Sequence, residues 1–192
     1  MRTRPGRQPE DRPPALASGL QAVFLVGFMG AGKSSVGRAL SLQLGWTFED
    51  LDERIQAREG RSIEQIFQQS GEPEFRMVEH SALRELIAEL GASPRVVALG
   101  GGAFVQPHNA ALLKETGVTS IFLDAPVEEL FRRCQQENFE RPLRRDSEHF
   151  RELYEARRPH YMEASLRIET AGKDIEAIAA EIARILNLGG KK

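Results

Sequence analysis

The sequence contains a single cysteine, Cys134, among its 192 residues. One cysteine excludes an intramolecular disulfide and suits a reducing compartment, so we expect a cytoplasmic protein with Cys134 in its core. No apolar run approaches the roughly 18 residues that a membrane span requires. The formal net charge is −2 without a basic stripe, so the electrostatic footprint of a nucleic-acid-binding protein is missing. We therefore expect neither a nucleic acid nor a membrane as a partner.

Residues 1–20 lack the apolar central region of a secretory signal, and their prolines and acids argue against a transit peptide. This arginine- and proline-rich stretch predicts a disordered tail, with a basic arm that docks on a partner as the alternative. The remaining length fits one domain with its own core. We place this domain at 21–188, before a flexible C-terminal tail at 189–192, and expect a monomer.

A glycine-rich segment at 27–34 links an apolar run at 22–26 to a stretch with helical spacing that ends at Leu44. Its sequence, G-F-M-G-A-G-K-S, fits the phosphate-binding pattern G-x-x-x-x-G-K-[ST] between a strand and a helix. Glycines let backbone N–H groups close round a polyphosphate, and the helix N-terminus adds a positive dipole end. The expected nucleotide-binding residues are Gly30, Ala31, Gly32, Lys33, Ser34 and Ser35.

Two side chains of this segment carry expected chemistry. Lys33 would reach the β- and γ-phosphates as a point charge, and the Ser34 hydroxyl would bind Mg²⁺. The alternative is a glycine-rich turn that binds no ligand.

Short apolar segments alternate with helical segments along the chain, which predicts an α/β fold with a parallel sheet and helices on both faces. We expect strands at 22–26, 46–50, 95–99, 120–123 and 166–169. We expect one helix that ends at 44, a second that ends at 60, a short third that begins at the capping box of Ser62 and Gln65, and a fourth from Gly71 to 91. Further helices are expected at 109–115, at 126–136, from 147 onward with an interruption near Pro159, and at 174–186.

Ligands of such sheets bind at the carboxyl ends of the strands. The phosphate-binding segment, Asp50, Asp52 and the run Gly100, Gly101 and Gly102 all fall at the carboxyl ends of expected strands, so we expect them to converge. Three successive glycines indicate a place where the backbone approaches a ligand or another loop closely.

Three acidic residues are candidates at this edge. Asp50 is our choice for the acid near Mg²⁺, through water, and Asp124 at the end of the fourth strand is its rival. Asp52 lies two residues after Asp50 and projects to the same side if the strand continues, where it could orient or deprotonate an acceptor hydroxyl. The alternative is that Asp52 only starts a helix.

Arginines supply the candidate positive charge. Arg76 and Arg157 could bind an anionic part of the substrate, with Glu79 orienting Arg76. A lid at about 137–149 contains Arg141, Arg144 and Arg145, and could close over the phosphates. A solvated charged loop is the alternative for this segment.

Seven segments together resemble the shikimate kinase family, the small P-loop kinases of aromatic amino-acid biosynthesis. They are G-F-M-G-A-G-K-S-S-V-G-R at 27–38, F-E-D-L-D at 48–52, G-R-S-I-E-Q-I-F at 60–67, G-E-P-E-F-R at 71–76, A-L-G-G-G at 98–102, R-P-L at 141–143 and R-R-P-H-Y at 157–161.

The resemblance implies a P-loop kinase fold: a five-stranded parallel sheet in the order 2-3-1-4-5 with a mobile lid. It also implies ATP-dependent phosphorylation of the shikimate 3-hydroxyl, with ATP as co-substrate and Mg²⁺ as cofactor. The implied roles are Lys33, Asp52 and Arg141 in catalysis, Arg141 also at the nucleotide, Ser34 and Asp50 at Mg²⁺, and Asp52, Arg76, Gly100, Gly101, Gly102 and Arg157 at shikimate.

Two departures from the family pattern concern the nucleotide side. Arg144 stands where the family usually has leucine, so the family pattern does not predict how the lid packs. Lys173 stands near the position where some members carry an adenine-contacting arginine, so we predict no adenine contact.

Two rival functions remain. A gluconate-type or nucleoside monophosphate kinase would share the phosphate-binding loop, but the order of the segments from 48 to 161 favours shikimate, and Asp52 would repel a phosphorylated acceptor. A binding module without catalysis should have lost a lysine, metal ligand or lid arginine, and Lys33, Ser34, Asp50 and Arg141 are all present.

Overall fold

The computed structural model describes residues 20–136 and 147–188. Predictions for 1–19, for the 137–146 part of the lid with Arg141, and for 189–192 lie outside this range.

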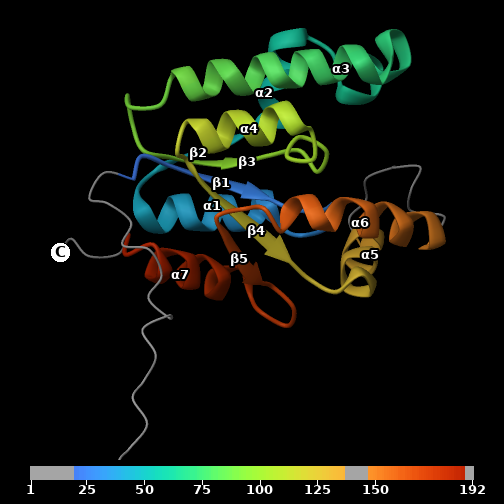
Figure 1. Cartoon of the computed structure of the whole chain (residues 1–192). Coiled ribbons are helices and arrows are strands. Elements are labelled where there is room, and N and C mark those ends of the chain that lie inside the picture. The colour runs from blue at the N-terminus through green and yellow to red at the C-terminus, as the bar shows by residue number, and fades with distance from the viewer. Residues whose placement is uncertain (1–19, 137–146, 189–192) are drawn as a thin grey trace, which may run out of the picture.

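The described residues form an α/β fold around five parallel strands (Figure 1). The strands are β1 (Ala22–Val26), β2 (Thr47–Asp50), β3 (Arg95–Ala98), β4 (Thr119–Asp124) and β5 (Leu166–Glu169). Their order in the sheet is β2-β3-β1-β4-β5, which confirms the predicted order.

The strand register aligns the ends that carry the predicted site. Ala98 of β3 pairs with both Asp50 of β2 and Leu25 of β1, and Leu25 in turn pairs with Ile121 of β4. Because the strands are parallel, the segments that follow them leave the sheet at one edge. The glycine-rich loop after β1 and the glycine run after β3 are therefore neighbours.

Helices cover both faces of the sheet. They are α1 (Lys33–Leu44), α2 (Leu51–Glu59), α3 (Ile63–Ala88), α4 (Pro107–Glu115), α5 (Val127–Gln136), α6 (Ser147–Tyr161) and α7 (Ile175–Ile185). Figure 1 shows α1 and α7 on one face, α2, α3 and α4 on the other, and α5 and α6 at the end where the strands finish.

Gly71 and Pro159 affect their helices differently from each other. Gly71 has φ 77° and ψ 174°, so α3 bends there, and the two helices predicted on either side of it follow one another without a loop. The interruption predicted near Pro159 is wrong, because α6 continues through it to Tyr161. A proline so close to the C-terminus removes only the bond that its missing N–H would make to the carbonyl four residues earlier.

The core lies between the sheet and both helical layers. Every residue of β1 is buried, as expected of a central parallel strand. Cys134 is buried as predicted. Within residues 20–136 and 147–188, every helix falls short of the length and apolar character needed to cross a bilayer.

The capping box at the start of α3 is confirmed. The Gln65 backbone N–H donates to Ser62 Oγ at 3.1 Å, and the Ser62 backbone N–H donates to Gln65 Oε1 at 2.8 Å. Ser62→Ala should lower the free energy of unfolding by about 1 kcal/mol, because the Gln65 N–H loses its acceptor. Urea unfolding measures this change, and Ser62→Thr, which keeps the hydroxyl, is the control. Equal stability of the alanine variant and wild type would contradict the prediction.

Candidate functional site

The loop between β1 and α1 has a backbone that only glycine adopts readily. Gly30 and Gly32 have φ values of 76° and 82°. A Cβ on Gly30 would lie 2.7 Å from the Leu130 carbonyl oxygen of α5, so the loop also approaches its neighbour too closely for a side chain. Gly32 is the N-cap of α1 and provides no side-chain cap, which leaves the first N–H groups of the helix for an anion.

The Lys33 ammonium lies inside the loop. Its Nζ donates to the carbonyl oxygens of Gly27 and Phe28, at 2.9 Å each. In this state the lysine holds the loop closed on itself. A phosphate oxygen can replace these carbonyl partners because it is a stronger acceptor for an ammonium.

Ser34 and Asp50 meet at the carboxyl end of β2. The Ser34 hydroxyl donates to Asp50 Oδ2 at 2.7 Å, and Asp50 Oδ1 accepts from the Asp52 backbone N–H at 3.0 Å. Asp50 is thus both the N-cap of α2 and the partner of the loop serine. The two side chains that the sequence analysis assigned to Mg²⁺ lie in contact.

These two side chains offer oxygen atoms only, which suits Mg²⁺. Among the described residues, no group of three or more His, Cys, Asp or Glu side chains could hold a metal ion. A cation between the loop and Asp50 would therefore complete its coordination with phosphate and water oxygens, as Mg²⁺ commonly does in phosphoryl-transfer sites.

Asp52 reaches the site by a route different from the one predicted. The strand does not continue past Asp50, and Asp52 lies in the first turn of α2, so the argument from strand alternation was wrong. The helix nevertheless brings its carboxylate against the glycine run, because a Cβ on Gly100 would lie 2.5 Å from Asp52 Oδ1. Asp52 is thus both a first-turn residue of α2 and a neighbour of the glycine run.

The three successive glycines let the backbone pass between functional side chains. A Cβ on Gly102 would lie 2.7 Å from both Nη atoms of Arg76, and a Cβ on Gly101 would lie 3.7 Å from the Met29 backbone nitrogen. The run therefore touches Asp52 and Arg76 and lies beside the phosphate-binding loop. This is the close backbone approach that the sequence indicated.

Arg76 is held by two carboxylates of its own helix. Its guanidinium bonds Glu79 and Glu72, at 2.9 Å in each case. Glu79 is buried, and this burial raises its pKa to about 7, while the charges of Arg76 and Arg157 oppose the rise and that of Asp52 adds to it. Arg76 bonds this carboxyl group directly, and Asp52 and Arg76 lie against neighbouring glycines of the same run, Gly100 and Gly102.

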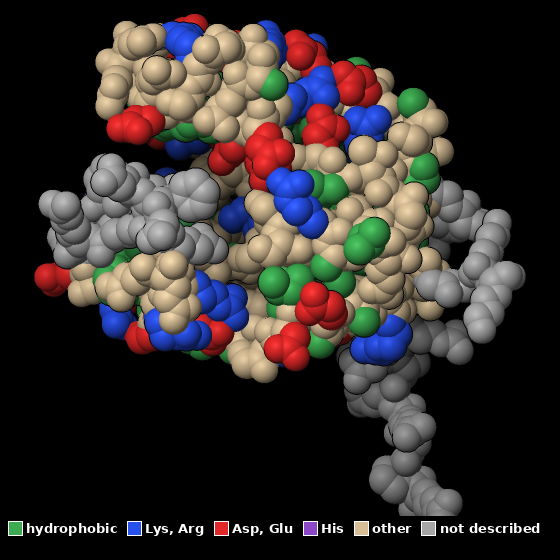
Figure 2. All heavy atoms as spheres, turned by 180° about the vertical axis from the view of Figure 1, so that it is seen from behind, with side chains coloured by type: hydrophobic (Ala, Val, Ile, Leu, Met, Phe, Trp, Pro, Cys, Tyr) green, Lys and Arg blue, Asp and Glu red, His purple; other side chains and the backbone are tan. Residues whose placement is uncertain are grey.

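Arg157 projects from α6 toward the phosphate-binding loop. Its guanidinium carbon lies 5.9 Å from the centre of the Phe28 ring. Figure 2 shows the molecule hollowed on this side, with Lys or Arg side chains visible inside the hollow. The structure therefore brings together Lys33, Ser34, Asp50, Asp52, Arg76, Gly100, Gly101, Gly102 and Arg157.

Two further residues of this region had no role in the sequence analysis. The Tyr161 hydroxyl donates to the Gly101 carbonyl, and burial raises the pKa of Tyr161 to about 12, so the phenol stays protonated and keeps this bond. Its position four residues after Arg157, on the same side of a helix, was the available signal. Arg133 of α5 donates to the Gly30 carbonyl at 3.5 Å and the Thr170 carbonyl at 3.1 Å, and no sequence pattern indicated it.

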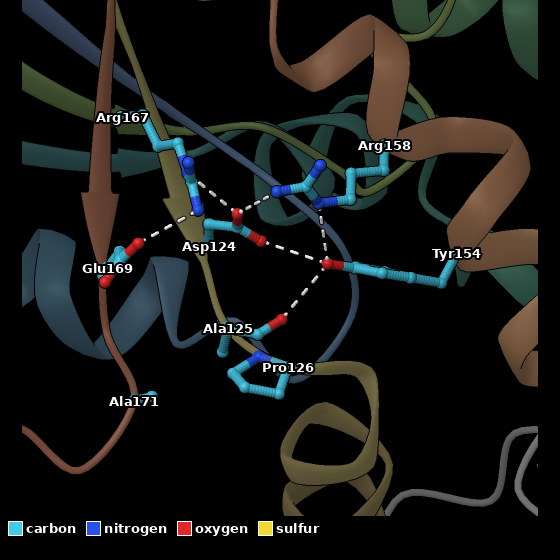
Figure 3. A pocket seen from close by; sticks show the side chains of 8 residues that line it. All are labelled: Asp124, Ala125, Pro126, Tyr154, Arg158, Arg167, Glu169 and Ala171. Atoms are coloured by element: carbon cyan, nitrogen blue, oxygen red, sulfur yellow. Dashed lines mark hydrogen bonds and ion pairs between the residues drawn. The ribbon is translucent and has the colours of Figure 1, made fainter.

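Asp124, the rival metal acid, lies in a separate cluster at the ends of β4 and β5 (Figure 3). Its carboxylate accepts bonds from Tyr154 at 3.1 Å and from Arg158 and Arg167 at 2.9 Å each. These side chains line a cavity of about 240 Å³ with Glu169. The loop serine bonds Asp50 instead, so the geometry favours Asp50 as the acid near the metal.

Glu79 makes stability depend on pH. Burial raises its pKa from 4.5 to about 7, so between these values the folded protein keeps a proton that the unfolded chain has released. This contribution to stability is full below pH 4.5 and is lost as the pH rises through about 7. Replacement by the neutral, similarly shaped glutamine should remove the dependence.

We therefore expect wild type to lose roughly 1–3 kcal/mol of stability relative to Glu79→Gln between pH 4.5 and 8. Urea unfolding of both proteins at several pH values measures the difference. Glu72→Gln, which removes the exposed partner of Arg76, is the control for losing one charge there. A difference that stays constant with pH would contradict the expectation.

Comparisons with known proteins agree with this site. The family model for shikimate kinase matches residues 29–187. The shikimate kinase of Geobacter metallireducens is 44% identical over 168 residues, which cover 86% of this chain and 91% of that protein. The crystal structure of shikimate kinase from Aquifex aeolicus has 37% sequence identity and a TM-score of 0.75, with 88% of this chain and 99% of that one covered.

The shikimate kinase of Acinetobacter baumannii, solved in complex with shikimate, has 33% identity and a TM-score of 0.77, over 90% of this chain and 96% of that one. The family model and the identity to full-length relatives confirm the resemblance drawn from the seven segments. The chain belongs to the shikimate kinase family.

Proposed function

We propose that this protein transfers the γ-phosphoryl group of ATP to the 3-hydroxyl of shikimate, giving shikimate 3-phosphate and ADP. The observation that carries the proposal is the convergence of a phosphate-binding loop with one carboxylate and two arginines at a single edge of the sheet. A polyhydroxylated carboxylic acid needs both kinds of group: an acceptor for its hydroxyls and cations for its carboxylate.

On the nucleotide side, the loop from Gly30 to Ser35 holds the phosphates through its N–H groups and the α1 N-terminus. Lys33 exchanges its two carbonyl partners for phosphate oxygens and stabilises the charge on the transferred group. Ser34 and Asp50, which lie in contact, would hold Mg²⁺, and the bound ion would neutralise charge on the β- and γ-phosphates.

On the acceptor side, Asp52 binds and orients the hydroxyls, while Arg76 and Arg157 bind the carboxylate. Glu79 holds Arg76 in place, so less side-chain freedom is lost when the substrate binds. The backbone of Gly100, Gly101 and Gly102 lies against the same substrate, because only a chain without side chains leaves room beside Asp52 and Arg76.

Arg141 completes the proposal as a second positive charge at the transferred phosphoryl group. It lies outside the described residues, so its role rests on the match of R-P-L at 141–143 to the family pattern. The monomeric state and the cytoplasmic location likewise stay predictions from the sequence.

The acceptor distinguishes this proposal from a kinase for another small molecule. A nucleoside monophosphate would bring a phosphate dianion close to the Asp52 carboxylate, which repels it. Gluconate shares the carboxylate and hydroxyls but lacks a rigid ring, so it would lose more conformational freedom on binding the same groups.

The first test measures ADP release with MgATP and each of shikimate, quinate, gluconate and nucleoside monophosphates. We expect turnover with shikimate to exceed turnover with every other acceptor by at least about 100-fold in kcat/KM, since mispaired buried polar groups cost several kcal/mol. Preference for another acceptor would refute the acceptor site and leave the ATP site standing. ATP binding without turnover of any acceptor would favour a binding module.

Arg157→Ala should raise KM for shikimate about 10- to 100-fold and leave KM for ATP within about twofold, because one charge-assisted contact to the carboxylate is lost. Arg151→Ala is the control, since Arg151 is on the same helix and pairs with the exposed Glu128. Steady-state kinetics with each substrate varied in turn measures both constants. Equal increases for shikimate and ATP would move Arg157 to the phosphate side.

A further inference from the structure

We propose that Asp124 is a positioning residue for the acceptor site: by binding Tyr154 and Arg158 it fixes α6 on the end of β4 and thereby sets the position of Arg157. This inference rests on the proposed function, in which Arg157 binds the substrate carboxylate. It assigns a role to the cluster of Asp124, Tyr154, Arg158 and Arg167 at the ends of β4 and β5.

Asp124 joins β4 to α6 through both carboxylate oxygens (Figure 3). Oδ1 accepts from the Tyr154 hydroxyl at 3.1 Å, and Oδ2 accepts from Arg158 Nη2 at 2.9 Å. Arg158 Nε also donates to the Tyr154 oxygen at 3.1 Å, which closes the group into a ring of bonds. Because Asp124 is buried, its interactions with these donors are weakly screened by solvent.

The two anchored residues flank Arg157 on α6. Tyr154 precedes it by three positions, one turn of helix, and Arg158 follows it directly. A rotation or shift of α6 that moved Arg157 would therefore have to break the Asp124 bonds. The Asp124 bonds to Tyr154 and Arg158 therefore fix both the position of α6 along its axis and its rotation about that axis at this turn.

The same face of α6 rests on the phosphate-binding loop. Phe28 contacts Phe150 edge to face at 5.0 Å and Tyr154 at 5.5 Å, and the Arg157 guanidinium lies 5.9 Å from its ring. Positions 150, 154 and 157 share one helix face. The Tyr154 ring thus packs on Phe28 while its hydroxyl bonds Asp124. Phe28 also lies beside the Arg157 guanidinium, so Tyr154 links Asp124 to the surroundings of Arg157.

Local sequence makes an external anchor useful here. Pro159 has no N–H to donate to the Glu155 carbonyl, so the helix loses one backbone bond across the turn that carries Arg157 and Arg158. Asp124 also neutralises the charge of two arginines, because Arg158 and Arg167 both donate to its Oδ2 atom. Without the carboxylate these two guanidinium groups would repel each other.

The charged side chains that line the cavity balance one another, which suits a structural role better than the binding of a charged ligand. Arg167 bonds Glu169 at 3.1 Å as well as Asp124, so two carboxylates balance two arginines within the cavity lining. A site for an anion would be expected to keep an excess of positive charge.

Arg158→Gln and Arg167→Gln form a matched pair for the test. Each removes one bond of 2.9 Å to the same Asp124 oxygen, and the two side chains are 36% and 41% exposed. Only Arg158 belongs to α6. We expect Arg158→Gln to raise KM for shikimate about 5- to 20-fold with KM for ATP within about twofold, and Arg167→Gln to leave both within about twofold at a similar loss of thermal stability.

Three further variants complete the design. Tyr154→Phe keeps the ring on Phe28 and removes only the hydroxyl, so it should raise KM for shikimate in the same selective way and serves if Arg158→Gln does not fold. Arg158→Lys should restore part of the loss, because an ammonium can still donate to Asp124. In an Arg157→Ala background, Arg158→Gln should add less than about twofold, since its effect acts through Arg157.

Equal effects of Arg158→Gln and Arg167→Gln on KM for shikimate would overturn the inference, as would a full additional effect in the Arg157→Ala background. Failure of the proposed function is a different result. It would already appear as absent shikimate turnover by wild type, or as an unchanged KM for shikimate in Arg157→Ala alone.

Discussion

The close approach of three backbone segments at the carboxyl edge of the sheet is the constraint on which this structure depends. The segments after β1, β2 and β3 leave the sheet side by side because Asp50, Ala98 and Leu25 are in register. Glycine at 100 and 102 then lets the chain pass within contact distance of Asp52 and Arg76. A side chain at either position would collide with the Asp52 carboxylate or the Arg76 guanidinium.

Carboxylates hold the arginines that this edge uses. Glu79 is buried beneath Arg76 and bonds it directly, whereas Asp124 acts on Arg157 through its helix neighbours. Burying a carboxylate costs free energy, and the shifted pKa of Glu79 records that cost. In the proposed function this cost serves substrate binding rather than stability, because an arginine already fixed in place would lose little freedom on binding a substrate carboxylate.

The agreement between sequence and structure differs from one part of the site to another. The loop from Gly27 to Ser34 was predictable because all of its features are contiguous: a strand, glycines at fixed spacing and a helix start. Asp50 and Asp124 are both aspartates at the carboxyl end of a strand. The sequence analysis preferred Asp50, and the bond that the Ser34 hydroxyl donates to Asp50 distinguishes the two acids in the structure. The side-chain direction of Asp52 was argued on the condition that the strand continues past Asp50, whereas β2 ends there as predicted and Asp52 lies in the first turn of α2.

By itself, the sequence determined the alternation of strands and helices, the phosphate-binding loop, the capping box of α3 and the membership of the shikimate kinase family. The first three depend on residue types at short, fixed spacings, which local backbone geometry converts directly into structure, and the family follows from the order of seven short segments between 27 and 161. Only the tertiary structure decided that α6 continues through Pro159, that Tyr161 bonds Gly101, and that Asp124 anchors Tyr154 and Arg158. The bonds of Tyr161 and Asp124 join residues 30 to 60 positions apart, and their formation depends on how helices pack on the sheet, which no local pattern records.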